Sequence, residues 1–322
     1  MADKKDETRH GVSLTNLDQP LFDDAGATKR DLVDYLEAVA DRMIPQLADR
    51  PLSVMRVRPG QPPFMQKNVP KYTPDFVKTT TVWAEASKRE ISYALCDDLP
   101  TLLWFGNQRA VEYHVTLMRH ERPDRVTHLV LDLDPPAGKN EFGAAVQAAH
   151  LVHRALTDSG LSGAVKTSGA KGVHVYVPID DSVSIEDAAG ATRAIAARAE
   201  KLDPALATTA FVVEDRAGKV FIDSTRAGGA TVISVYSPRL RPGVPVSFPV
   251  AWSDLDNVKP SDFTLATAVD ALAGKDPWVA ELPEPQRLPD DLLAEGREIP
   301  VARVAAMHEG KRRAQARRKA EN

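Results

Sequence analysis

The stretch that constrains the fold of this chain most is the alternating segment 128–136, which reads HLVLDLDPP. Alternating residues lie on opposite faces of a β-strand, so the leucines at 129, 131 and 133 share one face while Asp132 and Asp134 share the other. Pro135 ends the strand, because proline cannot donate a hydrogen bond to a neighbouring strand. The segment therefore predicts a strand with one buried apolar face and two neighbouring carboxylates on the opposite face.

Two carboxylates on one face of an apolar strand repel each other and are costly to desolvate, unless a cation or a bound proton offsets their charge. Oxygen ligands of this kind favour Mg²⁺ or Mn²⁺. Asp223, at the end of the predicted strand 219–223, supplies a third carboxylate that would complete a cation site. The alternative is that Asp132 and Asp134 are two solvated side chains beside a turn.

Composition is that of an ordinary globular protein. The 322 residues are 43% hydrophobic and 27% charged, which is enough for one large α/β unit or two packed subdomains. A single cysteine, Cys96, excludes an internal disulfide and fits a reducing compartment. The N-terminus is charged and no apolar run is long enough to span a bilayer, so we expect a cytoplasmic protein with no membrane partner.

Charge is distributed unevenly along the chain. The net charge of −4 argues against a uniformly cationic surface of the kind that coats nucleic acid. Six positive charges gather in the C-terminal segment 311–319. This basic tail is either a solubilising end or a contact for phosphates.

Three further segments carry polar residues that invite a functional interpretation. The predicted loop 59–68 places Phe64 near Lys67, which suits base stacking and phosphate contact, although loop aromatics often simply pack onto the protein body. In the turn 168–172, SGAKG, two glycines flank Lys171, so that Ser168, backbone N–H groups and the ammonium group would converge on an anion. No helix follows this lysine, so the turn is not a P-loop, and alone it is an ordinary hairpin turn. His114, in the predicted strand 111–116, shares a polar face with its neighbours and would usually be structural.

Taken together, LDLDPP, SGAKGVHVY and KVFID, in this order and spacing, resemble the primase-polymerase module of bacterial ATP-dependent DNA ligase D and its stand-alone relatives in the archaeo-eukaryotic primase superfamily. The resemblance runs from about residue 12 to 280 and takes in 14–18, 67–68, 112–114 and 236–239. It implies an α/β (α+β) fold: a two-layer primase-polymerase core, with a mostly antiparallel sheet like that of an RNA-recognition motif and flanking helices. Accordingly we expect a disordered segment 1–12, a primase-polymerase catalytic domain 13–280 and a proline-punctuated extension 281–322 that includes the basic tail.

The resemblance implies roles for individual residues. The catalytic, metal-binding carboxylates would be Asp132, Asp134 and Asp223, holding two Mn²⁺ or Mg²⁺ ions. The nucleotide-binding residues would be His114, Ser168, Lys171, His174 and Arg239. The DNA-binding residues would be Lys29, Phe64 and Lys67.

The implied activity is template-dependent addition of nucleotides, preferably ribonucleotides, to primer 3′ ends in gap filling, base excision repair or non-homologous end joining. Attack of the 3′-hydroxyl on the α-phosphate would be assisted by two cations. The resemblance implies a nucleoid-associated protein whose partners are DNA, nucleoside triphosphates and an end-binding protein. An ATP-dependent DNA ligase would be a separate partner, because the chain lacks the nucleotidyl-lysine motif of a ligase domain.

Two alternatives and two departures accompany this hypothesis. A D-x-D glycosyltransferase or phosphohydrolase would not explain the lysine turn and Asp223 together, and the intact carboxylates argue against a non-catalytic DNA-end bridging subunit. Gln19 stands where the family commonly has a lysine that helps hold a 5′-phosphate. Arg226 follows Ser224-Thr225 where many relatives read Ser-Gln-Asn, and it would be either a phosphate contact or a surface charge.

Overall fold

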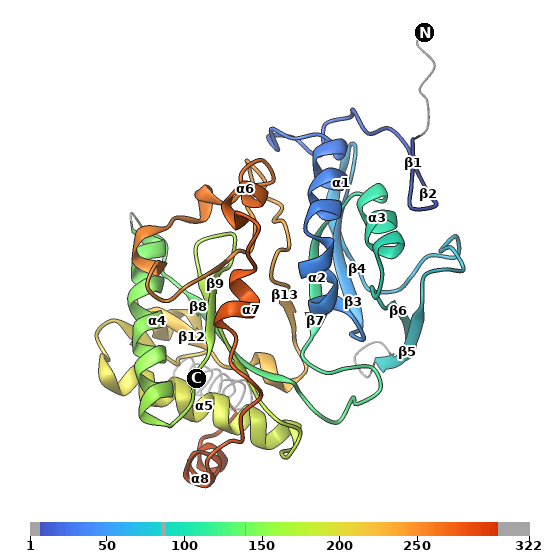
Figure 1. Cartoon of the computed structure of the whole chain (residues 1–322). Helices are drawn as coiled ribbons and strands as arrows, with labels where there is room; N and C mark the ends of the chain where they lie inside the picture. The colour runs from blue at the N-terminus through green and yellow to red at the C-terminus, as the bar shows by residue number, and fades with distance from the viewer. Residues whose placement is uncertain (1–6, 85–87, 139, 302–322) are drawn as a thin grey trace, which may run out of the picture. The chain divides into compact units, whose positions relative to one another are not determined.

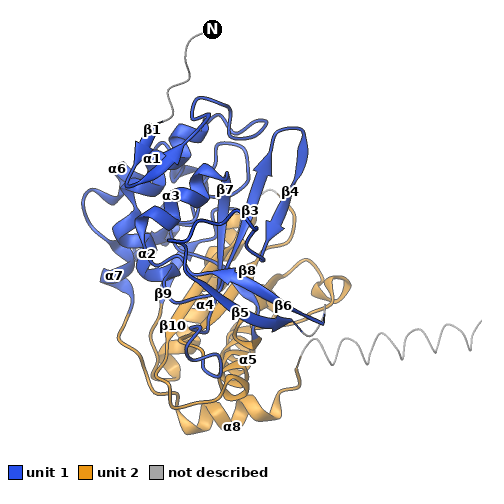
Figure 2. Ribbon diagram, turned by 90° about the vertical axis from the view of Figure 1, so that its right-hand side faces the viewer, with its two compact units in different colours: residues 1–125, 164–171, 229–282 blue, residues 126–163, 172–228, 283–322 orange. Residues whose placement is uncertain are grey.

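The computed structural model describes residues 7–84, 88–138 and 140–301, with the elements labelled in Figure 1. The chain divides into two compact units, each assembled from segments that are distant in the sequence (Figure 2). Unit 1 takes its residues from 1–125, 164–171 and 229–282, and unit 2 from 126–163, 172–228 and 283–322. Both units combine mainly antiparallel strands with helices, as the sequence predicts.

Unit 1 is built on a sheet with strand order β13-β7-β3-β6-β5, and β4 also pairs with β3. These strands are β3 Leu52–Arg58, β4 Gln61–Gln66, β5 Thr79–Ala84, β6 Arg89–Ala94, β7 Ala110–Thr116 and β13 Thr231–Ile233. The first three helices of this unit along the chain are α1 Lys29–Ala38, α2 Ala40–Leu47 and α3 Leu99–Asn107. Helix α3 packs against α1, α2 and β7, and covers the apolar residues of that strand.

The remaining elements of unit 1 come from later segments. Strand β9 Ala164–Thr167 pairs antiparallel with β14 Pro249–Val250, and α7 Pro277–Glu281 packs on both. The short helix α6 Ala268–Leu272 and the 3₁₀ turns η3 Leu255–Asn257 and η4 Pro260–Asp262 complete the unit.

Unit 2 contains the strand predicted from the alternating segment. Strand β8 His128–Asp134 lies between β10 Val173–Pro178 and β12 Val220–Asp223, and β11 Ala207–Thr208 flanks β12. The leucines at 129, 131 and 133 are fully buried, as predicted. Helix α4 Glu141–Asp158 packs on β8, β10 and β12, and α5 Ile185–Leu202 packs on α4 and β8. The short turns are η1 Val213–Arg216 and η2 Arg226–Gly228.

The C-terminal extension contributes helix α8 Asp290–Glu298, which packs on α5 within unit 2. The helices approach closely at two glycines, since a Cβ on Gly296 would lie 2.3 Å from the carbonyl carbon of Gly190. The basic tail 311–319 lies outside the described residues. Within the described part of the chain, no helix is both long and apolar enough to cross a bilayer.

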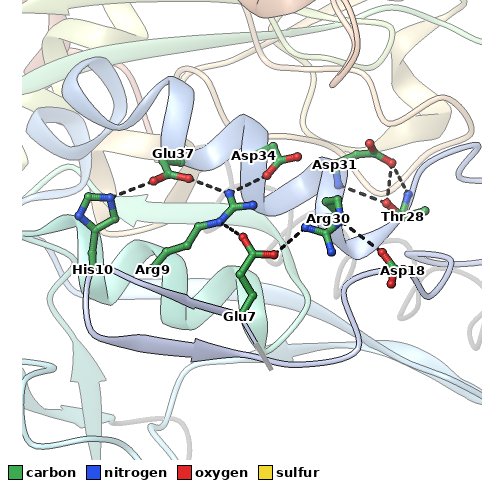
Figure 3. Close-up of polar contacts among 9 residues, drawn as sticks. All are labelled: Glu7, Arg9, His10, Asp18, Thr28, Arg30, Asp31, Asp34 and Glu37. Carbon is green, nitrogen blue, oxygen red and sulfur yellow. Dashed lines mark hydrogen bonds and ion pairs between the residues drawn. The ribbon is translucent and has the colours of Figure 1, made fainter. Parts of the chain in front are cut away.

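The N-terminal expectation is wrong for residues 7–12. Strand β1 Glu7–Arg9 pairs with β2 Val12–Leu14 in a hairpin. The Arg9 guanidinium donates to Asp34 and Glu37 on α1 at 2.6 and 2.7 Å, and Glu7 accepts from Arg30 at 2.7 Å (Figure 3). The charges that suggested disorder are therefore neutralised by opposite charges on α1.

The predicted loop 59–68 is also partly wrong, because residues 61–66 form strand β4. Gly60, at φ +71°, makes the tight turn that returns the chain against β3. Phe64 then lies opposite Arg56 in the antiparallel register. The prolines at 62 and 63 are exposed on a strand whose pairing partner is β3 alone among the described strands.

Candidate functional site

Three neighbouring strands of unit 2 bring acidic side chains together. In the sheet register, Asp132 of β8 is paired with Asp223 of β12 on one side and with His174 of β10 on the other. Side chains of directly paired residues project on the same face of a sheet, and Asp134 lies two residues along that face of β8. We call Asp132, Asp134 and Asp223 the acidic cluster. The predicted carboxylates are thus neighbours in the structure.

Each of two carboxylates in the acidic cluster has one oxygen held by its surroundings. Asp132 Oδ1 lies 3.1 Å from His174 Nε2. Asp223 Oδ1 accepts hydrogen bonds from the Thr225 backbone N–H at 2.8 Å and from the Thr225 hydroxyl at 2.6 Å. The other oxygen of each carboxylate, Oδ2, is contacted by Arg226 Nη2, at 2.7 Å from Asp132 and 3.0 Å from Asp223. Arg226 therefore bridges the two acids.

The ionisation of the acidic cluster reflects its excess of negative charge. Burial, followed by the negative charges of Asp132 and Asp223, raises the pKa of Asp134 to about 6. Burial also opposes ionisation of Asp132, but His174 and Arg226 outweigh it and lower the pKa of this carboxyl. Three carboxylates that share one guanidinium can bind further positive charge, and their oxygen atoms fit the preference of Mg²⁺ and Mn²⁺.

A second set of possible metal ligands lies in unit 1. Ligand atoms of Asp49, His120 and Glu121 all lie within 4.8 Å of one another. Among the described residues, no other three His, Cys, Asp or Glu side chains lie as close together as this. Asp49 is already paired with His120, and Arg119 Nη1 lies 3.6 Å from its second oxygen. The arginine charge opposes binding of a metal cation there. The acidic cluster also contains an arginine, Arg226, but it offers three carboxylates where the Asp49 group offers two.

In unit 1, Glu112 gathers predicted nucleotide-binding residues. Its Oε2 lies 2.9 Å from His114 Nε2, and its Oε1 accepts from Arg239 Nε at 3.0 Å and from the Leu240 N–H at 2.9 Å. Arg239 Nη1 donates to the Ser168 carbonyl oxygen. We call Glu112, His114, Ser168 and Arg239 the Glu112 cluster. Burial alone would raise the pKa of Glu112, but His114, Arg239 and the Leu240 N–H lower it to about 2.

Local sequence explains how this cluster is built. Glu112 and His114 alternate on β7 and so share a face, as the sequence predicts for His114. Gly169 has φ +67°, and a Cβ there would lie 2.6 Å from Arg239 Cγ, so glycine is needed for the turn to approach Arg239. The Ser168 hydroxyl accepts the Ala170 N–H at 3.2 Å, which orients it within the turn. Lys171, at the end of the turn, is half-buried.

The structure divides the predicted nucleotide-binding residues between the two units. His174 belongs to unit 2, where it contacts Asp132 of the acidic cluster. The other four, His114, Ser168, Lys171 and Arg239, belong to unit 1. The acidic cluster therefore belongs to unit 2 and the Glu112 cluster to unit 1.

The predicted DNA-binding residues differ in exposure. Phe64 on β4 is half-buried, and the guanidinium carbons of Arg56 and Arg58 lie 5.6 and 4.7 Å from its ring centroid. Lys67, just after β4, is exposed. An aromatic ring beside several cations is a suitable surface for a base and its phosphates.

Lys29 has a different environment from the one predicted. Its side chain is buried, and the ammonium group donates to the Thr15 carbonyl at 2.5 Å and to Asn107 Oδ1 at 2.6 Å. Burial lowers the pKa of Lys29 to about 8. Lys29 therefore ties the N-terminal segment to α3 within unit 1, and its contact with DNA stays a prediction. Gln19, the nearby departure, accepts a hydrogen bond from Arg109 at 2.6 Å.

Sequence reasoning missed two residues that organise these clusters. Glu112 was singled out only as part of the resemblance, although its position two residues before His114 already placed a carboxylate beside that ring. Arg226 had no firm role, although a buried excess of acids requires a counter-charge nearby. Neither contact follows from spacing alone, because Arg239 lies 127 residues from Glu112 and Arg226 lies 94 residues from Asp132.

Comparisons with known proteins show which family this chain resembles. The family model described as LigD, primase-polymerase domain matches residues 28–278. The bifunctional non-homologous end joining protein LigD of Bacillus subtilis is 34% identical over 268 residues, which are 81% of this chain and 42% of that protein. The multifunctional non-homologous end joining DNA repair protein LigD of Mycobacterium tuberculosis is 35% identical over 257 residues, 76% of this chain and 34% of that protein. The chain thus spans less than half of these relatives.

A solved structure matches at the level of the fold. The polymerase domain from Mycobacterium tuberculosis Ligase D, in complex with DNA, superimposes with a TM-score of 0.76 at 33% sequence identity. The match covers 84% of this chain and 99% of that structure. The predicted fold class is confirmed by this match.

Proposed function

Because this chain belongs to the LigD primase-polymerase family, whose members are nucleotidyltransferases, we propose that it adds nucleotides to primer 3′ ends on a DNA template during repair. The observation that carries the proposal is the acidic cluster, in which Asp132, Asp134 and Asp223 meet on one face of β8 and β12. A non-catalytic end-bridging protein has no need to keep three mutually repelling carboxylates that are buried or half-buried.

The acidic cluster would hold two Mn²⁺ or Mg²⁺ ions. When bound, such ions favour the deprotonated 3′-hydroxyl and offset charge on the leaving pyrophosphate. The chain's part is to keep the carboxylate oxygens in place. His174 Nε2, 3.1 Å from Asp132 Oδ1, and Thr225, bonded to Asp223 Oδ1, each orient one carboxylate by its other oxygen.

The Glu112 cluster would bind the nucleotide. Arginine binds phosphate oxygens as a fork, and Arg239 is pre-oriented by Glu112 and by the Ser168 carbonyl. Lys171 would add a point charge to the triphosphate. His114 and Ser168 would lie near the sugar, where a hydroxyl that distinguishes ribonucleotides from deoxyribonucleotides can be bonded. We therefore propose a preference for ribonucleotides.

The surface around Phe64 and Lys67 would contact the template strand. The ring offers a face for base stacking, the exposed Arg58 guanidinium lies 4.7 Å from its centroid, and Lys67 adds an exposed positive charge just after β4. We propose DNA ends or gaps as substrates, in gap filling, base excision repair or end joining. A DNA ligase and an end-binding protein would be functional partners.

The test is extension of a labelled primer-template by the purified chain with Mn²⁺ or Mg²⁺ and each nucleotide type. We expect template-directed extension in the presence of metal, with ribonucleotides used more efficiently than matched deoxynucleotides. Tight DNA binding without any extension would favour the end-bridging alternative instead. Extension with equal efficiency for both sugars would refute the ribonucleotide preference but leave the polymerase proposal standing.

A further inference from the structure

Arg226 occupies an unusual position in the acidic cluster. Its Nη2 contacts Asp132 Oδ2 at 2.7 Å and Asp223 Oδ2 at 3.0 Å, so a single nitrogen atom lies between two carboxylates. This differs from the paired arrangement in which two arginine nitrogens bind both oxygens of one carboxylate. Arg226 Nε is buried and has no hydrogen-bond partner in the described structure. The guanidinium is therefore held by charge at one point, much as a metal ion would be.

The oxygens that Arg226 contacts are the ones a cation would need. Asp132 Oδ1 lies against His174, and Asp223 Oδ1 is bonded to Thr225, which leaves the Oδ2 atoms of the two acids as the pair directed to a common ligand. Two positive groups that share these oxygens would repel each other strongly at such short range, because the site is largely buried. A divalent cation and the guanidinium therefore exclude each other from this position.

We propose that Arg226 is a built-in counter-ion, which occupies the place of a divalent cation in the metal-free protein and withdraws when the cation binds Asp132 and Asp223. The inference rests on the proposed function, because it takes the acidic cluster to be the cation site. Metal binding is then an exchange, in which the ion pairs of Arg226 are lost as the new bonds form. The exchange weakens metal affinity and stabilises the metal-free fold.

This proposal gives a specific role to the positive charge at position 226. With glutamine at 226, three carboxylates would lie together without a counter-charge from that position, and they would both repel one another and attract metal more strongly. With arginine, the same carboxylates are partly neutralised until enough metal is present. Position 226 thereby sets the concentration of divalent cation at which the acidic cluster fills.

The experiment is titration of the full chain with Mn²⁺ alone, by calorimetry, comparing wild type with Arg226→Gln. We expect Arg226→Gln to bind Mn²⁺ at least tenfold more tightly, to unfold at a lower temperature without metal and to gain more thermal stability when Mn²⁺ is added. Arg226→Lys, which keeps the charge, should remain closer to wild type than Arg226→Gln. The matched control is Arg154→Gln, because Arg154 is exposed on α4 of the same unit and pairs only with Asp158 among its described contacts, at 3.9 Å.

Equal or weaker Mn²⁺ binding by Arg226→Gln overturns the proposal, as does an equal gain for Arg154→Gln. If Arg226→Gln is unstable without metal, the same affinity is obtained by chelator competition on protein kept in Mn²⁺ throughout. Asp132→Asn separates this inference from the proposed function. If Asp132→Asn binds Mn²⁺ as tightly as wild type, the acidic cluster is not the cation site, and the proposed function loses its support. If Asp132→Asn loses Mn²⁺ binding but Arg226→Gln has no effect on it, only the role of Arg226 is rejected.

Discussion

The acidic cluster and the Glu112 cluster balance their charges in opposite ways. In the Glu112 cluster, one carboxylate receives His114, Arg239 and a backbone N–H, and its pKa falls to about 2. In the acidic cluster, three carboxylates share Arg226 and His174, and the pKa of Asp134 rises to about 6. A carboxylate that accepts hydrogen bonds from several donors holds those donors in fixed orientations. Carboxylates with too few donors around them retain negative charge that can bind an added cation. The first arrangement suits positioning, and the second suits binding of cations.

The largest effect should come from removing the carboxylates of the acidic cluster, which tests whether this cluster binds the catalytic cations. We expect Asp132→Ala, Asp134→Ala and Asp223→Ala each to reduce primer extension by at least about 100-fold, because charge in the transition state loses stabilisation. Primer extension under saturating nucleotide and Mn²⁺ measures this effect. Asp158→Ala, an exposed acid on α4, serves as the control. Near-wild-type extension by any one variant would remove that residue from the site.

The free energy of unfolding of the metal-free protein should distinguish Asp132 from Asp134. Asp134→Ala should leave the metal-free protein as stable or more stable, because repulsion is relieved. Asp132→Ala should cost about 1–3 kcal/mol, because it leaves the buried contacts of Arg226 and His174 unpaired. Denaturant unfolding in the presence of a chelator measures both. Equal destabilisation by the two variants would contradict the unequal sharing of Arg226 that the structure shows.

The Glu112 cluster should respond differently, mainly through nucleotide affinity. Glu112→Gln keeps the shape of the side chain but removes the charge that orients Arg239 and His114. Hydrogen bonds to charged groups contribute about 1.5–3 kcal/mol, so we expect the catalytic efficiency to fall roughly 10–100-fold. Steady-state kinetics should show most of this fall as a raised KM for the nucleotide. Glu90→Gln, exposed on β6, is the matched control, and an unchanged KM would contradict a positioning role.

Acid should erase the stability that Glu112 provides. A carboxylate whose folded pKa is depressed stabilises the fold above its unfolded pKa of 4.5, and this contribution disappears as the pH falls toward about 2. We expect the free energy of unfolding of wild type to exceed that of Glu112→Gln by about 2 kcal/mol at pH 7. This difference in unfolding free energy should narrow steadily below pH 4.5. Urea unfolding at a series of pH values measures the difference. A gap that stays constant down to pH 3 would show that it does not arise from this ionisation.

These clusters also show what could be predicted from the sequence. The face shared by Asp132 and Asp134 follows from an alternation of period two, which is local and needs no tertiary information. The pairing of Asp223 with Asp132 depends on the register between β8 and β12, so the sequence alone offered Asp223 only as a carboxylate at the end of a predicted strand. The bridging role of Arg226 could not be predicted, because a flexible side chain selects its partner only after distant strands have aligned.

Burial was harder still to predict. Lys29 occupies a position matched to DNA-facing residues of the family, yet its ammonium group lies inside unit 1 against Thr15 and Asn107. The DNA-facing role came from the family resemblance alone, and the burial of Lys29 depends on contacts with Thr15 and Asn107 that no local sequence pattern specifies. The hairpin of residues 7–14 was missed for a related reason, since the charges of Arg9 and Glu7 suggested disorder until partners on α1 were known.

The smallest effect that we predict concerns the choice of sugar. The Ser168 hydroxyl accepts the Ala170 N–H at 3.2 Å, which holds the side chain within its turn. Ser168 is only 5% exposed, so a hydrogen bond between its hydroxyl and a ribose 2′-hydroxyl would be largely shielded from water. If the two hydroxyls form this bond, Ser168→Ala should reduce the ratio of ribonucleotide to deoxynucleotide efficiency by up to about tenfold, since each 1.4 kcal/mol corresponds to one factor of ten. The loss should fall on ribonucleotide use, while Ser13→Ala, on an exposed position of β2, should leave the ratio unchanged. If the ratio of ribonucleotide to deoxynucleotide efficiency is the same in Ser168→Ala as in wild type, Ser168 does not select the sugar. His114, which contacts Glu112, would then be the residue to test for sugar selection.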